Sequence, residues 1–185
     1  MKKRNLIVLG ATLFLAFGLY AQKTAISNGI INWKGTEITK EFHKGTIEIS
    51  SGSLSFDGDS LVDGAFTVDM NSIVCTDLSE KYAAKLVGHL KSDAFFGVAE
   101  HPEAKLKFTS VVPTEEGYKV TGDFTIRGIT HPENFIIKLD GNKATADLEI
   151  DRSKYNVKFR SGSFFKNLGD KLINDEFELS VSFTY

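Results

Sequence analysis

The stretch FELSVSFTY, residues 177–185, ends the chain and decides its fold. Apolar side chains take every second position in it, at Phe177, Leu179, Val181, Phe183 and Tyr185. Glu, Ser or Thr fills each position between them. Successive side chains of a β-strand point to opposite faces, so this period of two predicts a strand with one apolar and one polar face. The same pattern recurs along most of the chain.

Six earlier segments alternate in the same way. They are residues 45–50, 65–71, 103–110, 118–127, 134–139 and 144–151. One solvent-exposed face and one buried face are typical of strands in antiparallel sheets. Residues that favour turns lie between the segments, at 50–53, 57–60, 115–117 and 140–142. These short connections predict sequential hairpins.

One helix is expected between two of these strands. Apolar residues recur every four positions there, at Leu78, Tyr82, Leu86 and Leu90. Asp77 and Glu80 have the spacing of a capping box, which starts many helices. We therefore expect a helix from about 78 to 91, and a second long connection at 161–171.

Seven or eight long strands with one helix predict an all-β fold, a closed antiparallel barrel of about eight strands. Closure is favoured because it leaves no unpaired sheet edge. A barrel of about eight strands encloses either a packed core or one small ligand. The inward positions mix small residues such as Gly122 and Ala146 with many Phe. That mixture leaves a filled core and a cavity as open alternatives.

The N-terminal segment is expected to lie outside the barrel. Three cations at positions 2–4 precede an uncharged apolar run, 6–19, and a small residue, Ala21. This order is typical of a cleaved export signal. The run is short for a membrane span, although a retained anchor is the alternative. We expect residues 1–21 to be removed, 22–185 to form one domain, and the protein to be periplasmic or secreted.

Charge and cysteine content exclude several classes of partner. The segment 22–185 has 19 basic and 24 acidic residues, because the three cations at 2–4 are lost with no acid, and its formal net charge is −5. Nucleic acid is not expected without a basic face. Stable membrane insertion is not expected after signal cleavage, because no later apolar run is long enough. Cys75 is the only cysteine, so no internal disulfide forms.

The motifs GHLKSDAFFGVAEHPEAKLKFTS (88–110) and VTGDFTIRGITHP (120–132) resemble the signature of the YceI-like family of exported, lipocalin-like proteins. Shorter segments at 43–52, 68–73, 150–159 and 169–183 are similar to that family too. The matching residues of the first motif are Gly88, His89, Leu90, Lys91, Ser92, Phe95, Phe96, Pro102, Ala104 and Phe108. Leu106 and His101 stand where the family more often has aromatic residues. The likeness covers nearly all of 29–185 in the expected order.

The resemblance implies a lipocalin-like barrel that holds one long-chain isoprenoid or quinone-like lipid, with no established enzyme activity. Burial of a hydrocarbon tail stabilises such a complex by ~0.8 kcal/mol per CH₂, so an apolar tube suffices. The residues expected to contact the lipid are Phe66, Val68, Phe108, Val120, Phe124, Ile126, Phe135, Ile137, Leu148, Phe177, Leu179 and Phe183. The entrance is expected at Leu86, Leu90, Phe95 and Phe96, where the helix and the FFGVAEHP loop (95–102) form a gate.

No catalytic set is visible in the sequence. It has no Gly-x-Ser-x-Gly elbow, phosphate-cradling glycine loop or nucleotide fingerprint. The four histidines, His43, His89, His101 and His131, have no short metal-ligand spacing. We expect no enzyme, no catalytic residue, no metal site and no required cofactor, with a bound isoprenoid or quinone lipid as the partner.

Several readings stay open at this point. The pair Asp151-Arg152 is either a polar clamp on a quinone head group or an ion pair that fixes the end of the barrel, and Arg127 is expected to be solvated. Gly122 marks either a bend or a close approach of the lipid. The rival functions are an enzyme acting on isoprenoid lipids and a filled-barrel protein-interaction module. A homodimer also stays open.

Overall fold

The computed structural model describes residues 21–185. The predicted export signal, 1–21, lies outside these described residues except for its last position and stays a prediction. The strands are β1 (Gln22–Ala25), β2 (Ser27–Glu37), β3 (Phe42–Asp57), β4 (Ser60–Cys75), β5 (Glu103–Thr114), β6 (Gly117–Ile126), β7 (Ile129–Asp140), β8 (Lys143–Asp151) and β9 (Ile173–Thr184). One α-helix, α1 (Glu80–Lys91), lies between β4 and β5. Two short 3₁₀ helices, Arg152–Tyr155 and Gly169–Lys171, lie between β8 and β9.

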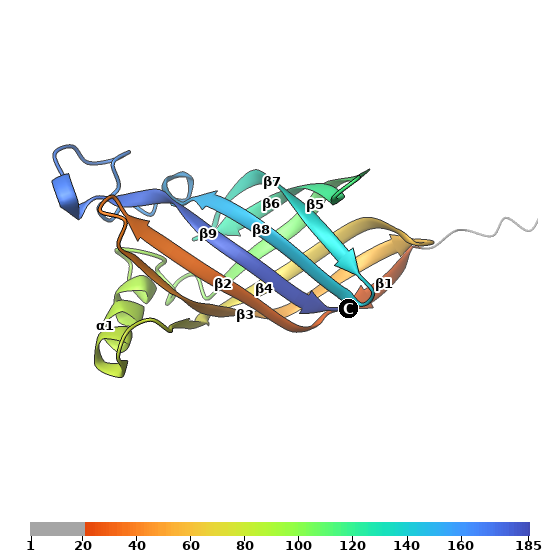
Figure 1. The fold of residues 1–185 in the computed structure, drawn as a ribbon, viewed down its shortest axis with the longest axis horizontal. Helices are drawn as coiled ribbons and strands as arrows, with labels where there is room; N and C mark the ends of the chain where they lie inside the picture. The colour runs from red at the N-terminus through yellow and green to blue at the C-terminus, as the bar shows by residue number, and fades with distance from the viewer. Residues whose placement is uncertain (1–20) are drawn as a thin grey trace, which may run out of the picture.

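Eight strands form a closed antiparallel ring (Figure 1). The strand order is β3-β2-β9-β8-β7-β6-β5-β4, and pairing of β3 with β4 closes it. The short β1 pairs with the end of β3 and lies outside the ring. The predicted all-β barrel with one helix is therefore confirmed. The sequence segments had not indicated β1 and β2, because polar residues and glycines interrupt the alternation in 22–37.

The predicted turn at 50–53 is wrong. These residues continue β3, which runs unbroken for 16 residues. Ile49 pairs with Val68 and Ser51 with Thr67, so Ser50 is an extra residue that bulges out of the ladder. Gly and Ser suit a bulge as well as a turn, and bulges add the bending that a closing sheet needs. The predicted turns at 57–60, 115–117 and 140–142 are hairpins in the structure.

Helix α1 starts at Glu80, two residues later than predicted, and the capping box is absent. The Asp77 carboxylate instead accepts hydrogen bonds from the backbone N–H of Lys44 (2.8 Å) and from His43 Nδ1 (2.9 Å). Ser79 occupies the N-cap without a side-chain cap bond. Asp77 thus ties β3 to the start of the helix rather than capping it. The helix lies at one end of the barrel, together with the long β8–β9 connection (Figure 1).

The apolar interior has two parts. The larger cluster runs along the barrel and includes Phe66, Phe108, Phe135 and Phe183. The smaller cluster lies beneath α1 and includes Leu90 and Phe95. The side chains of these two clusters do not fill the barrel completely, and a cavity remains between them.

Candidate functional site

A cavity of about 180 Å³ lies inside the barrel. On this measure roughly 10–15 Å³ accommodates one water molecule, so the space is far larger than a packing defect. Side chains from all eight ring strands form its wall, together with Leu90 of α1 and the two Phe of the following loop. The wall is almost entirely apolar; its polar members are Lys105, Arg152 and Asn174. An apolar space of this kind suits a hydrocarbon chain better than a polar metabolite.

Most of the sequence-predicted contact residues lie in this wall. Those that line the cavity are Phe66, Val68, Phe108, Phe124, Ile126, Phe135, Ile137, Leu148, Phe177, Leu179 and Phe183. Val120 does not line it: its side chain is fully buried in the larger cluster, beyond the cavity. Of the predicted entrance residues, Leu90, Phe95 and Phe96 line the cavity, whereas Leu86 only packs against the smaller cluster.

Sequence reasoning missed a large part of the wall. The additional apolar lining residues are Ile31, Trp33, Ile47, Ile49, Met70, Ile73, Ala104, Leu106, Ala146, Ile173 and Val181. Several of them, such as Ile47, Met70 and Val181, share an alternating face with the predicted set, so periodicity alone could have added them. The members from β2 had no such signal, because the strand itself was not predicted.

Gly35 leaves an open place in the wall of the cavity. It follows Ile31 and Trp33 on the inward face of β2 and pairs with Phe177 of β9. A Cβ atom on Gly35 would meet no heavy atom within 4 Å. The missing side chain therefore contributes free volume at the α1 end of the cavity, where a larger residue would project into the space.

Gly122 contributes no comparable opening. A Cβ atom there would come within 2.5 Å of Leu106 Cδ1, in the segment where the β5–β6 register shifts between Phe108 and Ser110. Leu106, and not the Gly122 backbone, lines the cavity. Of its two readings, the bend in the sheet fits the structure.

The cap over the α1 end is held by aromatic packing and by one arginine. The Phe95 and Phe96 rings are 5.0 Å apart between centroids in an edge-to-face arrangement. Phe96 also meets Phe177 of β9 at 6.4 Å. Arg127 Nη1 donates hydrogen bonds to the carbonyl oxygens of Phe95 and Asp93. The prediction that Arg127 is solvated is therefore wrong, because its side chain anchors the loop that carries Phe95.

Arg152 lies in the cavity wall but its donors are occupied. Its side chain is 2% exposed, and Nε donates to the carbonyl of Asn174 at 3.1 Å. Nη1 donates to the carbonyls of Phe159 (2.8 Å) and Val157 (3.3 Å), and Nη2 to that of Ile173 (3.0 Å).

Arg152 also forms an ion pair, but not with its neighbour in sequence. Nη2 lies 3.3 Å from Asp175 Oδ1, while Asp151 accepts a hydrogen bond from the Ser153 backbone N–H. A clamp on a head group needs free donors, whereas this guanidinium already donates four hydrogen bonds to backbone carbonyls and pairs with a carboxylate. Of the two readings of Asp151-Arg152, the ion pair that fixes the barrel end fits the structure, with Asp175 as the partner.

A second polar cluster joins His43, Cys75 and Asp77 outside the cavity. The thiol donates to Asp77 Oδ1 at 3.2 Å. Burial, together with the Asp77 carboxylate, raises the pKa of Cys75 above its ordinary value, so the thiol stays protonated near neutral pH. A protonated thiol is a weak nucleophile and a poor metal ligand.

Residues 21–185 contain neither a candidate metal site nor a candidate membrane-spanning helix. Within that range no three His, Cys, Asp or Glu side chains are placed to hold a metal ion. The same range contains no helix that is long and apolar enough to cross a membrane.

Comparison with known proteins agrees with the barrel. A UPF0312 protein of Vibrio parahaemolyticus is 31% identical over 137 residues, which covers 70% of both chains. The crystal structure of BcnA from Burkholderia cenocepacia superposes with a TM-score of 0.66 at 20% identity, covering 85% of this chain and 96% of that one. A polyisoprenoid binding domain from Saccharophagus degradans, implicated in plant cell wall breakdown, superposes with a TM-score of 0.58 at 12% identity, covering 89% and 99%.

The family profile described as the YceI-like domain matches residues 21–185, which is the whole described barrel. The resemblance seen in the sequence motifs is thereby confirmed. With its eight-stranded ring and its Vibrio relative, the chain belongs to the YceI-like family.

Proposed function

We propose that this protein binds one long-chain isoprenoid or quinone-like lipid inside the barrel, and carries or buffers it in the periplasm or outside the cell without catalysing a reaction. The apolar cavity lined by all eight ring strands is the observation that carries the proposal. The polyisoprenoid-binding description of the Saccharophagus domain supports it. The basic and then apolar N-terminal segment supports an exported location.

The composition of the wall indicates how the lipid is recognised. The one buried cation in the wall, Arg152, has its donors occupied by carbonyls. Binding therefore relies on removing the tail from water, at ~0.8 kcal/mol per CH₂. Selectivity then follows chain shape and length, and the polar head group lies at the cavity opening and not within it. The filled-barrel alternative would require side chains to occupy this space.

Entry and release require a movable part of the wall. We place the gate at α1 and the loop 95–102, because Leu90, Phe95 and Phe96 line the cavity from these segments. Replacing Phe95 and Phe96 with Ser should speed lipid exchange, because the aromatic contacts to each other and to Phe177 are lost. Unchanged exchange rates, measured with a fluorescent polyprenol, would remove the gate from the proposal.

A plugged variant tests the cavity itself. Gly35→Phe puts an aromatic ring into the open place of the inner wall, and Asn32→Phe puts the same ring on the exposed outer face of the same strand. Protein purified from its own compartment is analysed by native mass spectrometry and solvent extraction. We expect lipid in the wild type and in Asn32→Phe, and a loss of most bound lipid in Gly35→Phe.

A melting experiment provides the second readout. A polyprenol that binds the folded state should raise the melting temperature of the wild type and of Asn32→Phe, but not of Gly35→Phe. A wild-type protein that carries no extractable lipid and shows no polyprenol-dependent rise would overturn the proposal. Turnover of a bound isoprenoid by the wild type would instead favour the enzyme alternative.

A further inference from the structure

Exposed aromatic side chains gather at one end of the barrel. The described residues expose Phe42, Phe164 and Phe165 by 41–49%, and Tyr82 by 62%. Tyr82 belongs to α1, Phe42 is the first residue of β3, and Phe164 and Phe165 lie in the β8–β9 connection at the same end. Ile38, 53% exposed, lies in the β2–β3 hairpin at this end too. The exposed apolar residues at the opposite end are two valines, Val62 and Val112. Large apolar groups in water at one end only are typical of an interaction surface.

Two loops form this surface as one unit, which we call the docking face: Ile38, Phe42, Phe164 and Phe165. The backbone N–H of Ile38 donates to the carbonyl of Leu172 at 3.0 Å. The N–H groups of Phe164 and Phe165 both bond to the carbonyl of Ser161, which holds the turn that exposes the two rings. The β2–β3 hairpin and the β8–β9 connection accordingly lie side by side in Figure 1.

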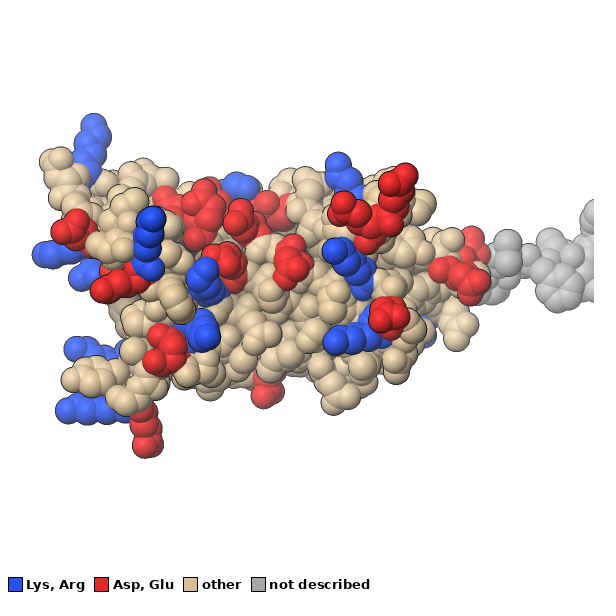
Figure 2. Space-filling model, in the orientation of Figure 1, with Lys and Arg blue, Asp and Glu red and all other residues tan. Residues whose placement is uncertain are grey.

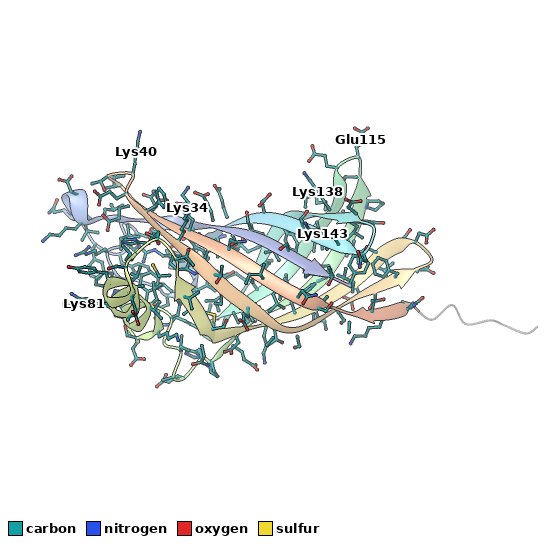
Figure 3. All side chains as sticks on the ribbon, turned by 60° about the horizontal axis from the view of Figure 1, so that its bottom comes forward. Lys34, Lys40, Lys81, Glu115, Lys138 and Lys143 are labelled. Carbon is teal, nitrogen blue, oxygen red and sulfur yellow. The ribbon has the colours of Figure 1, made fainter. Side chains whose placement is uncertain are left out.

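The docking face carries a local positive charge. The segments 34–44 and 158–172 contain seven basic and three acidic residues, a net charge of +4, whereas the whole chain has a formal charge of −2. Lys and Arg project from this end in Figure 2, and Lys34 and Lys40 are placed there in Figure 3. Lys158 Nζ lies 5.3 Å from the centroid of the Phe164 ring, and Lys34 Nζ lies 5.5 Å from that of Phe42.

We infer that the docking face binds reversibly to the surface of an anionic lipid bilayer. Aromatic rings with cations around them suit the boundary between headgroups and acyl chains. The net charge of −5 predicted for the exported chain does not favour contact with an anionic bilayer. At ordinary salt, however, charges on the surface interact only within about 10 Å. The positive charge of the docking face itself therefore determines whether it attracts anionic lipids.

The position of the cavity favours a bilayer over a protein partner. Gly35 and Ile173 line the cavity and lie within a few residues of Ile38 and Leu172. Docking through this face therefore brings the open part of the wall to a source of hydrocarbon chains. In this respect the inference rests on the proposed function, since it describes where the lipid is taken up and released.

Flotation with vesicles tests the inference. The protein is mixed with vesicles of phosphatidylcholine alone, or of phosphatidylcholine with phosphatidylglycerol, and the bound fraction is measured at low and high salt. We expect binding to the anionic vesicles that weakens with salt. The double variant Phe164→Ser/Phe165→Ser should lose most of it. In the double variant Lys166→Gln/Lys171→Gln, the affinity for anionic vesicles should fall about fivefold for each positive charge removed.

A matched control separates the docking face from general hydrophobicity. Val62→Ser/Val112→Ser removes two exposed apolar residues from the opposite end and should leave vesicle binding unchanged. Polyprenol binding without vesicles should be the same in Phe164→Ser/Phe165→Ser as in the wild type, because neither residue lines the cavity.

Three results would overturn the inference: no flotation of the wild type with anionic vesicles, equal flotation of both double Ser variants, or a wild-type dimer that Phe164→Ser/Phe165→Ser converts to monomer. The last result would identify the face as a contact between two copies of the chain. Vesicle binding that depends on Phe164 and Phe165 in a protein that binds no polyprenol would retain the docking face and reject the proposed function instead.

Discussion

The guanidinium of Arg152 and the carboxylate of Asp175 form a buried ion pair, with Nη2 and Oδ1 3.3 Å apart at the α1 end of the barrel. Asp175 also accepts a hydrogen bond from Ser163 Oγ at 2.7 Å. The pair thus connects the end of β8, the long connection and the start of β9. It ties these three segments together at the end of the cavity beneath the gate, where Asp175 Oδ1 accepts no hydrogen bond from the described residues besides its ion pair.

We expect Arg152→Met to unfold far more easily than the wild type. The substitution leaves a buried carboxylate and four carbonyls without their partner, and breaking a buried pair in this way costs about 3–5 kcal/mol. Urea unfolding measures the change in the free energy of unfolding. Lys34→Met removes the exposed partner of Glu178 and should cost less than about 1 kcal/mol. Equal losses in the two variants would show that Arg152 has no special structural role.

Acid should destabilise the protein partly through Asp77. Burial alone raises the pKa of this carboxyl, but hydrogen bonds from Lys44, His43 and Cys75 outweigh it and lower the pKa from 3.8 to about 2. The unfolded chain therefore takes up this proton first as the pH falls, so the contribution of Asp77 is complete above 3.8 and is lost towards about 2.

The Asp77→Asn variant tests whether stability contributed by Asp77 is lost as the pH falls. Its free energy of unfolding, from urea titrations at a series of acid pH values, should fall less steeply than that of the wild type across this window. A parallel fall in both proteins would contradict the assignment.

Two glycines should respond oppositely to alanine. At Gly45 the new methyl group would run into the carbonyl oxygen of Val74 and lie 2.8 Å from Trp33 Cζ2, so we expect a loss of about 1–3 kcal/mol. At Gly88, an exposed position in α1, a Cβ atom meets nothing within 4 Å, and Ala should stabilise the helix by about 0.5–1 kcal/mol. Thermal and urea unfolding of the two variants measure whether each substitution lowers or raises the free energy of unfolding.

Loosening the anchor of the gate should change rates more than affinity. Arg127→Gln removes the hydrogen bonds to the carbonyls of Asp93 and Phe95 while the cavity wall stays intact. We expect faster polyprenol exchange in stopped-flow measurements, with nearly unchanged equilibrium binding. Lys138→Gln, on the outer face of β7 towards the opposite end (Figure 3), is the matched control. Slower or unchanged exchange in Arg127→Gln would place the gate elsewhere.

Local patterns were enough to predict the class of fold and part of the cavity wall. Alternation of the kind seen from Phe177 to Tyr185 assigns each side chain to a face, because a strand has a period of two whatever surrounds it. Once a barrel was expected, the apolar face had to be the inner one. The reversal predicted at 50–53 was wrong because Gly and Ser permit a bulge and a turn alike, and pairing with β4 selects between them.

The hollow interior, the partner of Arg152 and the docking face depended on contacts between residues distant in the chain. Asp151 adjoins Arg152 in sequence, yet Asp175 lies closer in space, because the connection after β8 folds back along β9. Whether a ring of Phe fills a barrel or lines a cavity depends on how the rings from opposite strands meet, as Phe66 meets Phe183 and Phe108 meets Phe135. Periodicity assigns a face to a side chain but carries no information on the volume left between facing side chains, so only the folded barrel could reveal the cavity.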